Sequence, residues 1–153
     1  DTIDKDEGTV LSKGMYHKGA DVWILNSKRE ILIQKRAPKK RLEPNLWAMT
    51  GGSVIKGESS LDTIKRETKE ELGIDLDVEK AIKIQHYKTG NVWLDVYIVE
   101  QEVNLNDIIM QEEEVSDVKF VSFDEIESLY KDNKFMANRW EFVREEIKKY
   151  IKK

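Results

Sequence analysis

Apolar and polar residues alternate along several short stretches of the chain, which is the pattern of half-buried β-strands. In residues 30–36 the two isoleucines would lie on one face of a strand, with Leu32 and Gln34 on the other. The complete set of predicted strands is residues 21–25, 30–36, 47–50, 81–87, 92–99 and 118–122. Turn-forming residues would close hairpins between the first two and between the fourth and fifth. A short strand or irregular lead-in is expected at residues 9–11.

Three other stretches repeat apolar residues at helical spacing, at residues 60–72, 122–130 and 138–152. The first contains neither Gly nor Pro. Ser59 or Ser60 can cap its start, and Gly73 follows it, where a left-handed residue commonly ends a helix. The second opens with a capping box. The third carries one apolar stripe, formed by Trp140, Val143, Ile147 and Ile151.

Three glutamates gather on the first predicted helix. Glu67, Glu70 and Glu71 are spaced i, i+3 and i+4, so they share one face, opposite the apolar side, and we expect this face to be exposed. Like charges at this spacing destabilise a helix by tenths of a kcal/mol per pair. A bound cation would offset the repulsion, and oxygen ligands suit Mg²⁺ or Mn²⁺. The alternative is a solvated acidic face.

The sequence around this helix resembles the Nudix box, in which Gly, Glu, an Arg-Glu pair, two further glutamates and a Gly-aliphatic pair recur at fixed spacing. In this chain the matching positions are Gly52, Glu58, Arg66, Glu67, Glu70, Glu71, Gly73 and Ile74. Thr68 stands where an aliphatic residue is usual. Because threonine keeps a methyl group for packing, we expect a weaker core contact and an intact site.

The resemblance implies a fold, a reaction and a cofactor. The fold would be the Nudix-type α/β/α sandwich with a mixed β-sheet, as a single domain over residues 1–153. The reaction would be hydrolysis of the pyrophosphate linkage in a nucleoside diphosphate derivative or a related diphosphate compound. The cofactor would be Mg²⁺ or Mn²⁺. The substrate would be a small molecule.

The resemblance also implies roles for individual residues. The Gly51 carbonyl and the carboxylates of Glu67, Glu70 and Glu71 would bind the metal, and Arg66 would orient a glutamate by ion pairing. Glu58 would tie the loop to the helix. Either Glu67 or a glutamate on a later loop would be the general base. Of the three glutamates at residues 112–114, Glu114 best matches a distal metal-binding glutamate by its distance ahead of Phe120.

Two positions outside the box are candidates for substrate binding. The basic loop after residue 35 offers phosphate ligands, and its cationic residues are Arg36, Lys39, Lys40 and Arg41. Arg36 is the best of these because a strand end would hold it, although a charged loop is often only solvated. Asp95 lies between two aromatic residues on one strand face, where it would either contact substrate or point outward.

Two alternatives to a hydrolase remain. The pattern over residues 17–47 resembles isopentenyl-diphosphate isomerases, but the catalytic cysteine and a metal-binding histidine of those enzymes correspond here to Gly51 and Ser53. Without a thiol, isomerase chemistry is disfavoured. A non-catalytic nucleotide-sensing domain of the same family would usually lack box glutamates, and this chain keeps them. The subgroup marks for ADP-ribose, NADH and dinucleoside polyphosphates are missing, which leaves the substrate open.

Composition narrows the class of partner. The chain has 153 residues, a net charge of −4 and no cysteine, which excludes disulfides and thiolate metal sites. A nucleic-acid polymer would require a basic surface, so we expect none as a partner. No apolar stretch is long enough to span a membrane, and the first residues do not resemble a signal peptide. We therefore expect a cytoplasmic monomer or homodimer.

Overall fold

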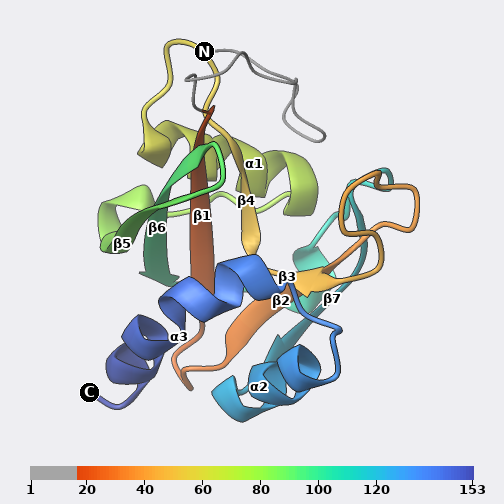
Figure 1. Ribbon diagram of the computed structural model, residues 1–153. Helices are drawn as coiled ribbons and strands as arrows, with labels where there is room; N and C mark the ends of the chain where they lie inside the picture. The colour runs from red at the N-terminus through yellow and green to blue at the C-terminus, as the bar shows by residue number, and fades with distance from the viewer. Residues whose placement is uncertain (1–16) are drawn as a thin grey trace.

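The computed structural model describes residues 17–153, so the predicted lead-in at residues 9–11 lies outside the described part. The strands form a mixed sheet in the order β3-β2-β1-β6-β5, with β4 paired to β1 and β7 to β2 (Figure 1). Their bounds are β1 His17–Leu25, β2 Ile31–Arg36, β3 Trp47–Ala48, β4 Thr50–Ser53, β5 Ile82–Thr89, β6 Val92–Glu100 and β7 Val115–Val121. All the predicted strands are present, and β1 and β7 begin earlier than predicted.

The helices cover both faces of the sheet (Figure 1). They are α1 Ser60–Leu72, α2 Phe123–Lys131 and α3 Ala137–Ile151, and two short 3₁₀ turns span Val78–Lys80 and Leu105–Asp107. On one face, Val22 and Ile24 of β1 pack in the same cluster as Ile64 of α1. On the other, Trp23 packs in a second cluster with Trp140 of α3. The alternation along β1 therefore supplies both cores, and the α/β/α sandwich is confirmed.

The sheet divides in the middle, and this division makes room for a site. The strands β1 and β2 pair antiparallel only where Ile24 and Leu25 face Leu32 and Ile31. Beyond that point β1 pairs with β4, whereas β2 pairs with β3 and β7. The stretch predicted as one strand over residues 47–50 is therefore two, because the chain crosses at Met49 from the partner of β2 to the partner of β1.

Candidate active site

Helix α1 is fixed at both ends by the residues that the sequence indicated. Ser59 is the N-cap, and its side chain accepts from the backbone N–H of Asp62, whose carboxylate accepts from the backbone N–H of Ser59 in return. Gly73 ends the helix with a φ of 71°, a conformation that favours glycine. The glutamates between these two caps are therefore held in one helical register.

Burial separates the three glutamates of α1. The prediction of an exposed acidic face is wrong for two of them, because Glu67 and Glu71 are 1% and 4% exposed. Only the Glu70 side chain is substantially exposed, at 38%. Glu71 accepts a hydrogen bond from Gln34 Nε2 of β2 at 2.9 Å, and Thr50 Oγ1 donates to Gln34 Oε1 at 3.0 Å. Glu67 and Glu71 thus face the division in the sheet, where the neighbouring strands enclose them.

Burial and a neighbouring carboxyl raise the pKa of Glu71 well above its ordinary value. The largest cause is loss of solvation, followed by the hydrogen bond and charge of Glu67, while the hydrogen bond from Gln34 opposes the shift. Two acidic side chains therefore meet in a poorly solvated position. This is an arrangement that a divalent cation would relieve.

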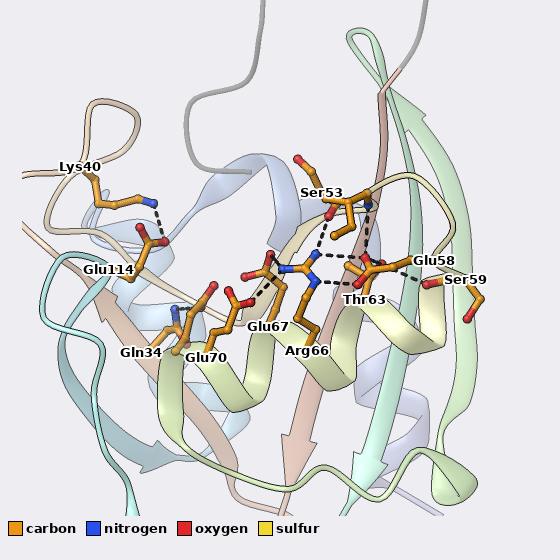
Figure 2. A network of polar contacts seen from close by, with 12 residues as sticks. Gln34, Lys40, Ser53, Glu58, Ser59, Thr63, Arg66, Glu67, Glu70 and Glu114 are labelled. Atoms are coloured by element: carbon orange, nitrogen blue, oxygen red, sulfur yellow. Dashed lines mark hydrogen bonds and ion pairs between the residues drawn. The ribbon is translucent and has the colours of Figure 1, made fainter. Parts of the chain in front are cut away.

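Arg66 joins the loop before α1 to the glutamates of the helix (Figure 2). Its Nε donates to Glu58 Oε2 at 2.6 Å, its Nη1 donates to Glu67 Oε2 at 3.0 Å, and its Nη2 donates to the Ser53 carbonyl at 3.1 Å. Glu70 Oε2 lies 3.5 Å from Nη1. These contacts are the ion pairing that the sequence predicted for Arg66.

Glu58 completes the link between the loop and α1. Besides its bonds to Arg66, it accepts from Thr63 Oγ1 and from the Ile55 backbone N–H. The hydrogen bond from Arg66 is the largest cause that holds the pKa of Glu58 below its ordinary value. The carboxylate therefore stays charged and ties the loop to the helix, as expected.

The two glycines of β4 leave space for acidic side chains. A Cβ at Gly52 would overlap the carboxylate of Glu67, and a Cβ at Gly51 would overlap Asp21 Oδ1 and lie 2.7 Å from the Ala20 carbonyl oxygen. Both glycines lie in an antiparallel pairing with β1, and neither has a positive φ. Glycine is required here for close approach, and not for a sharp turn.

The acidic loop before β7 packs against the end of α1. The backbone N–H of Ile109 donates to the Leu72 carbonyl, and that of Gln111 donates to the Glu71 carbonyl, both at 2.9 Å. This docking leaves the two preceding glutamates exposed but buries Glu114, at 7% exposure. Glu114 Oε1 accepts from Lys40 Nζ at 2.8 Å (Figure 2).

These elements enclose a cleft of about 570 Å³. Of the predicted site residues, the cleft is lined by Arg36, Gly51, Glu67, Glu71 and Glu114. Glu70 and Arg66 are not part of the lining, although both contact the network behind it. The structure therefore brings together Arg36 at the end of β2, the glycine and glutamates of β4 and α1, and Glu114 of the loop before β7.

The two predicted substrate-binding residues lie in different places. Arg36 lines the cleft, and its guanidinium donates to the carbonyls of Leu42 and Glu43, so it also holds its own loop. Asp95 is not among the lining residues. It is buried, and its Oδ1 instead lies 2.6 Å from His86 Nδ1 and 3.6 Å from Lys83 Nζ, two side chains of the neighbouring strand β5.

Sequence reasoning missed one charged pair in the cleft. Asp21 of β1 is 3% exposed, and its Oδ2 lies 3.0 Å from Arg139 Nε of α3. Burial raises the pKa of Asp21, although the charge and hydrogen bond of Arg139 oppose the shift. The signal was a single carboxylate in the otherwise apolar stretch from Ala20 to Leu25.

The lining suits a hard divalent cation by its chemistry. The predicted ligands in this lining all supply oxygens, from Glu67, Glu71, Glu114 and the Gly51 carbonyl, as Mg²⁺ and Mn²⁺ prefer. Within residues 17–153, no three acidic or histidine side chains already stand in a metal-holding arrangement. The fit therefore rests on the donor type and on the apposed carboxyls of Glu67 and Glu71.

The chain is similar to known proteins in both sequence and structure. Residues 15–145 match the NUDIX domain family. An uncharacterised Nudix hydrolase of Listeria innocua is 39% identical over 132 residues, covering 84% of this chain and 77% of that protein. An isopentenyl-diphosphate Delta-isomerase of Pectobacterium atrosepticum is 30% identical over 81% of this chain and 70% of the isomerase. The crystal structure of a MutT protein from Methanosarcina mazei superposes with a TM-score of 0.70 at 21% identity, over 92% and 96% of the two chains.

Proposed function

The chain belongs to the Nudix family of pyrophosphohydrolases, and on this premise we propose that it hydrolyses the pyrophosphate linkage of a nucleoside diphosphate derivative or a related diphosphate compound, with Mg²⁺ or Mn²⁺ as cofactor. The observation that carries the proposal is the convergence of Glu67, Glu71 and Glu114 on one cleft that also holds Arg36 and Lys40. Carboxylates and cations are thus available together for a metal and for an anionic substrate.

In this proposal the metal would be held by Glu67, Glu71 and Glu114 with the Gly51 carbonyl, and Glu70 would add a negative charge through its contact with Arg66 behind the cleft. When bound, it would neutralise phosphate oxygens and lower the pKa of a water molecule. Arg36 attracts the diphosphate to the cleft through its positive charge. Glu67 or Glu114 accepts the proton of the attacking water as the new P–O bond forms and the bridging P–O bond breaks.

Arg66 acts behind these groups in the proposed mechanism. Its contacts with Glu58, Glu67 and Ser53 fix the Glu67 carboxylate in place, so it positions a ligand without touching substrate. Asp95 is proposed to pair with His86 and Lys83 rather than to bind substrate, because it is buried and is not among the residues that line the cleft.

The isomerase alternative is less well supported, although one relative is an isopentenyl-diphosphate isomerase. The position that corresponds to the catalytic cysteine is Gly51, where a side chain would overlap Asp21 and approach the Ala20 carbonyl. A thiol therefore has no room in the present packing. The chain also contains no cysteine.

The experiment that tests the function measures phosphate and nucleotide release from a panel of diphosphate compounds with Mg²⁺, with Mn²⁺ and with EDTA. The panel comprises nucleoside triphosphates, ADP-ribose, NADH, dinucleoside polyphosphates, CoA and isoprenoid diphosphates. Cation-dependent cleavage of one class is the expected result. Tight binding of one compound without cleavage would instead favour a nucleotide-sensing domain.

The remaining expectations concern the protein's surroundings. No helix within residues 17–153 combines the length and the apolar character needed to cross a lipid bilayer. We propose a small-molecule diphosphate as the partner and a cytoplasmic location. Light scattering would show whether the protein is a monomer or a homodimer, the two states that we expect.

A further inference from the structure

A buried ion pair closes one side of the cleft. Lys40 Nζ donates to Glu114 Oε1 at 2.8 Å, and the two side chains are 5% and 8% exposed (Figure 2). Surface ion pairs contribute little because water competes for both charges, but a buried charge that loses its partner is strongly destabilising. The two residues are therefore held together by burial as well as by charge.

The backbone holds the lysine over the glutamate. The Ala37 backbone N–H donates to the Glu114 carbonyl at 3.0 Å, and the Lys40 backbone N–H donates to the Ala37 carbonyl at 3.1 Å. The loop after β2 and the loop before β7 are thus joined by a backbone hydrogen bond and by the side-chain ion pair. Lys40 is positioned by the fold and does not reach Glu114 by a chance rotamer.

The glutamate held in this way faces the other carboxylates of the cleft. Glu114 and Glu71 line the same space, and the charge of Glu114 is among the causes, after burial and Glu67, that raise the pKa of Glu71. A divalent cation placed between these carboxylates would need oxygen atoms of Glu114, one of which already accepts from Lys40. The ammonium and the cation therefore compete for one carboxylate.

We propose that Lys40 is the internal counter-ion of Glu114, which holds the buried carboxylate in place until a divalent cation replaces the lysine. Lys40 is then a positioning residue, and it sets the concentration at which a divalent cation occupies the site. The inference rests on the proposed function, since it takes Glu114 as a metal ligand. Because binding couplings are reciprocal, removal of the lysine must tighten cation binding by the factor with which the cation weakens the ion pair.

The test measures Mn²⁺ binding in the absence of substrate, by the loss of the free-Mn²⁺ signal in electron paramagnetic resonance. Lys40→Met should bind Mn²⁺ at least about fivefold more tightly than the wild-type protein, which is the low end of ordinary coupling between sites. Lys40→Arg should restore weaker binding. Lys40→Gln, which keeps a hydrogen-bond donor, serves if the methionine variant does not fold.

Two controls isolate the ion pair. Lys39→Met removes the same charge from the adjacent, exposed position and should leave the Mn²⁺ affinity unchanged. In a Glu114→Gln background, Lys40→Met should give no gain, because the carboxylate for which lysine and cation compete is absent. Unchanged or weaker binding by the folded Lys40 variants would overturn the inference, and so would a gain that persists in the Glu114→Gln background.

The outcomes separate this inference from the proposed function. If wild-type protein binds Mn²⁺ and hydrolyses a diphosphate while the Lys40 variants bind Mn²⁺ no more tightly, only the role of Lys40 is wrong. If the wild-type protein neither binds the cation nor hydrolyses any compound in the panel, the proposed function fails and the inference fails with it.

Discussion

Burial decides the properties of individual residues in this cleft. Glu67 and Glu71 are adjacent on one face of α1 and both lie inside, whereas Glu70, one residue before Glu71, is partly exposed. Helical spacing gives the shared face, but only the neighbouring strands determine which part of that face is covered. The buried pair is where charge is most costly and where a cation has most to stabilise.

Glu71→Gln is predicted to lower kcat more than about 100-fold, because loss of a direct metal ligand should exceed the 10- to 100-fold cost of losing an outer partner. Glutamine has the same shape, and its carbonyl can still accept from Gln34, so the fold should persist. Turnover with Mg²⁺ and thermal unfolding measured on the same sample check both statements. Wild-type turnover in this variant would remove Glu71 from the metal site.

Thr68 carries a buried hydroxyl on the packed side of α1. The residue is fully buried, and its Oγ1 makes no hydrogen bond with any group of residues 17–153. Thr68→Val exchanges this hydroxyl for a methyl group of similar size, so the variant should be more stable by about 1 kcal/mol. Urea unfolding measures the difference. A loss of stability would show that the hydroxyl is satisfied in solution.

At the scale of elements, the contact between α1 and β4 sets the geometry of the site. Helix α1 packs against β4 so closely that Glu67 occupies the space above Gly52. Arg66 then joins the end of β4, through the Ser53 carbonyl, and the following loop, through Glu58, to the same helix. The glycine and the arginine therefore serve one purpose, which is to hold the Glu67 carboxylate beside the strand.

Gly52→Ala is predicted to impair activity more than stability. The added Cβ would overlap the Glu67 carboxylate and lie 2.8 Å from its Cγ, so Glu67 must move while the strand keeps its backbone geometry. We expect at least a tenfold loss of kcat, since outer changes that misorient a ligand cost about 10- to 100-fold. Gly57→Ala is unsuitable as a control because its φ is 91°.

A matched control is Ser53→Ala, at the next residue of β4, which accepts from Arg66 through its backbone carbonyl. This variant keeps that carbonyl and should retain most of the wild-type activity. Steady-state kinetics for the two variants, with circular dichroism to check folding, make the comparison. Equal activity in both would show that Glu67 adjusts without loss.

For the whole molecule, the division of the sheet brings distant segments together. The site takes residues from the end of β2, from β4, from α1 and from the loop before β7. The carboxylates of the site therefore come together only when the entire domain is folded. A ligand that binds them in the folded state alone must stabilise the domain by mass action.

Mg²⁺ or Mn²⁺ is predicted to raise the midpoint of thermal unfolding, and EDTA to reverse the increase. At a cation concentration of 100 times Kd the expected stabilisation is about 2.7 kcal/mol. Calorimetry on wild type and Glu71→Gln tests this, with the smaller increase expected in the variant. An equal increase in both proteins would place the cation elsewhere.

The sequence alone predicted the helices and strands, apart from the division at Met49, and the glutamates that the candidate site draws from α1. Helix caps, strand alternation and the spacing of the glutamates are set by neighbours a few residues apart, so local patterns were enough to limit the N-cap to Ser59 or Ser60 and to assign Gly73 and the glutamates of α1. The resemblance to the Nudix family added Gly51 and Glu114 by position.

Only the tertiary structure decided which of these groups are buried and what they touch. Gln34 and Glu71 are 37 residues apart, and Lys40 and Glu114 are 74 apart. Asp21 and Arg139 come from opposite ends of the described chain. Such pairs depend on strand order and on the crossing at Met49, which local periodicity does not specify. The burial of Glu67 and the ion pair of Lys40 follow from that topology, because it closes the strands and loops around α1.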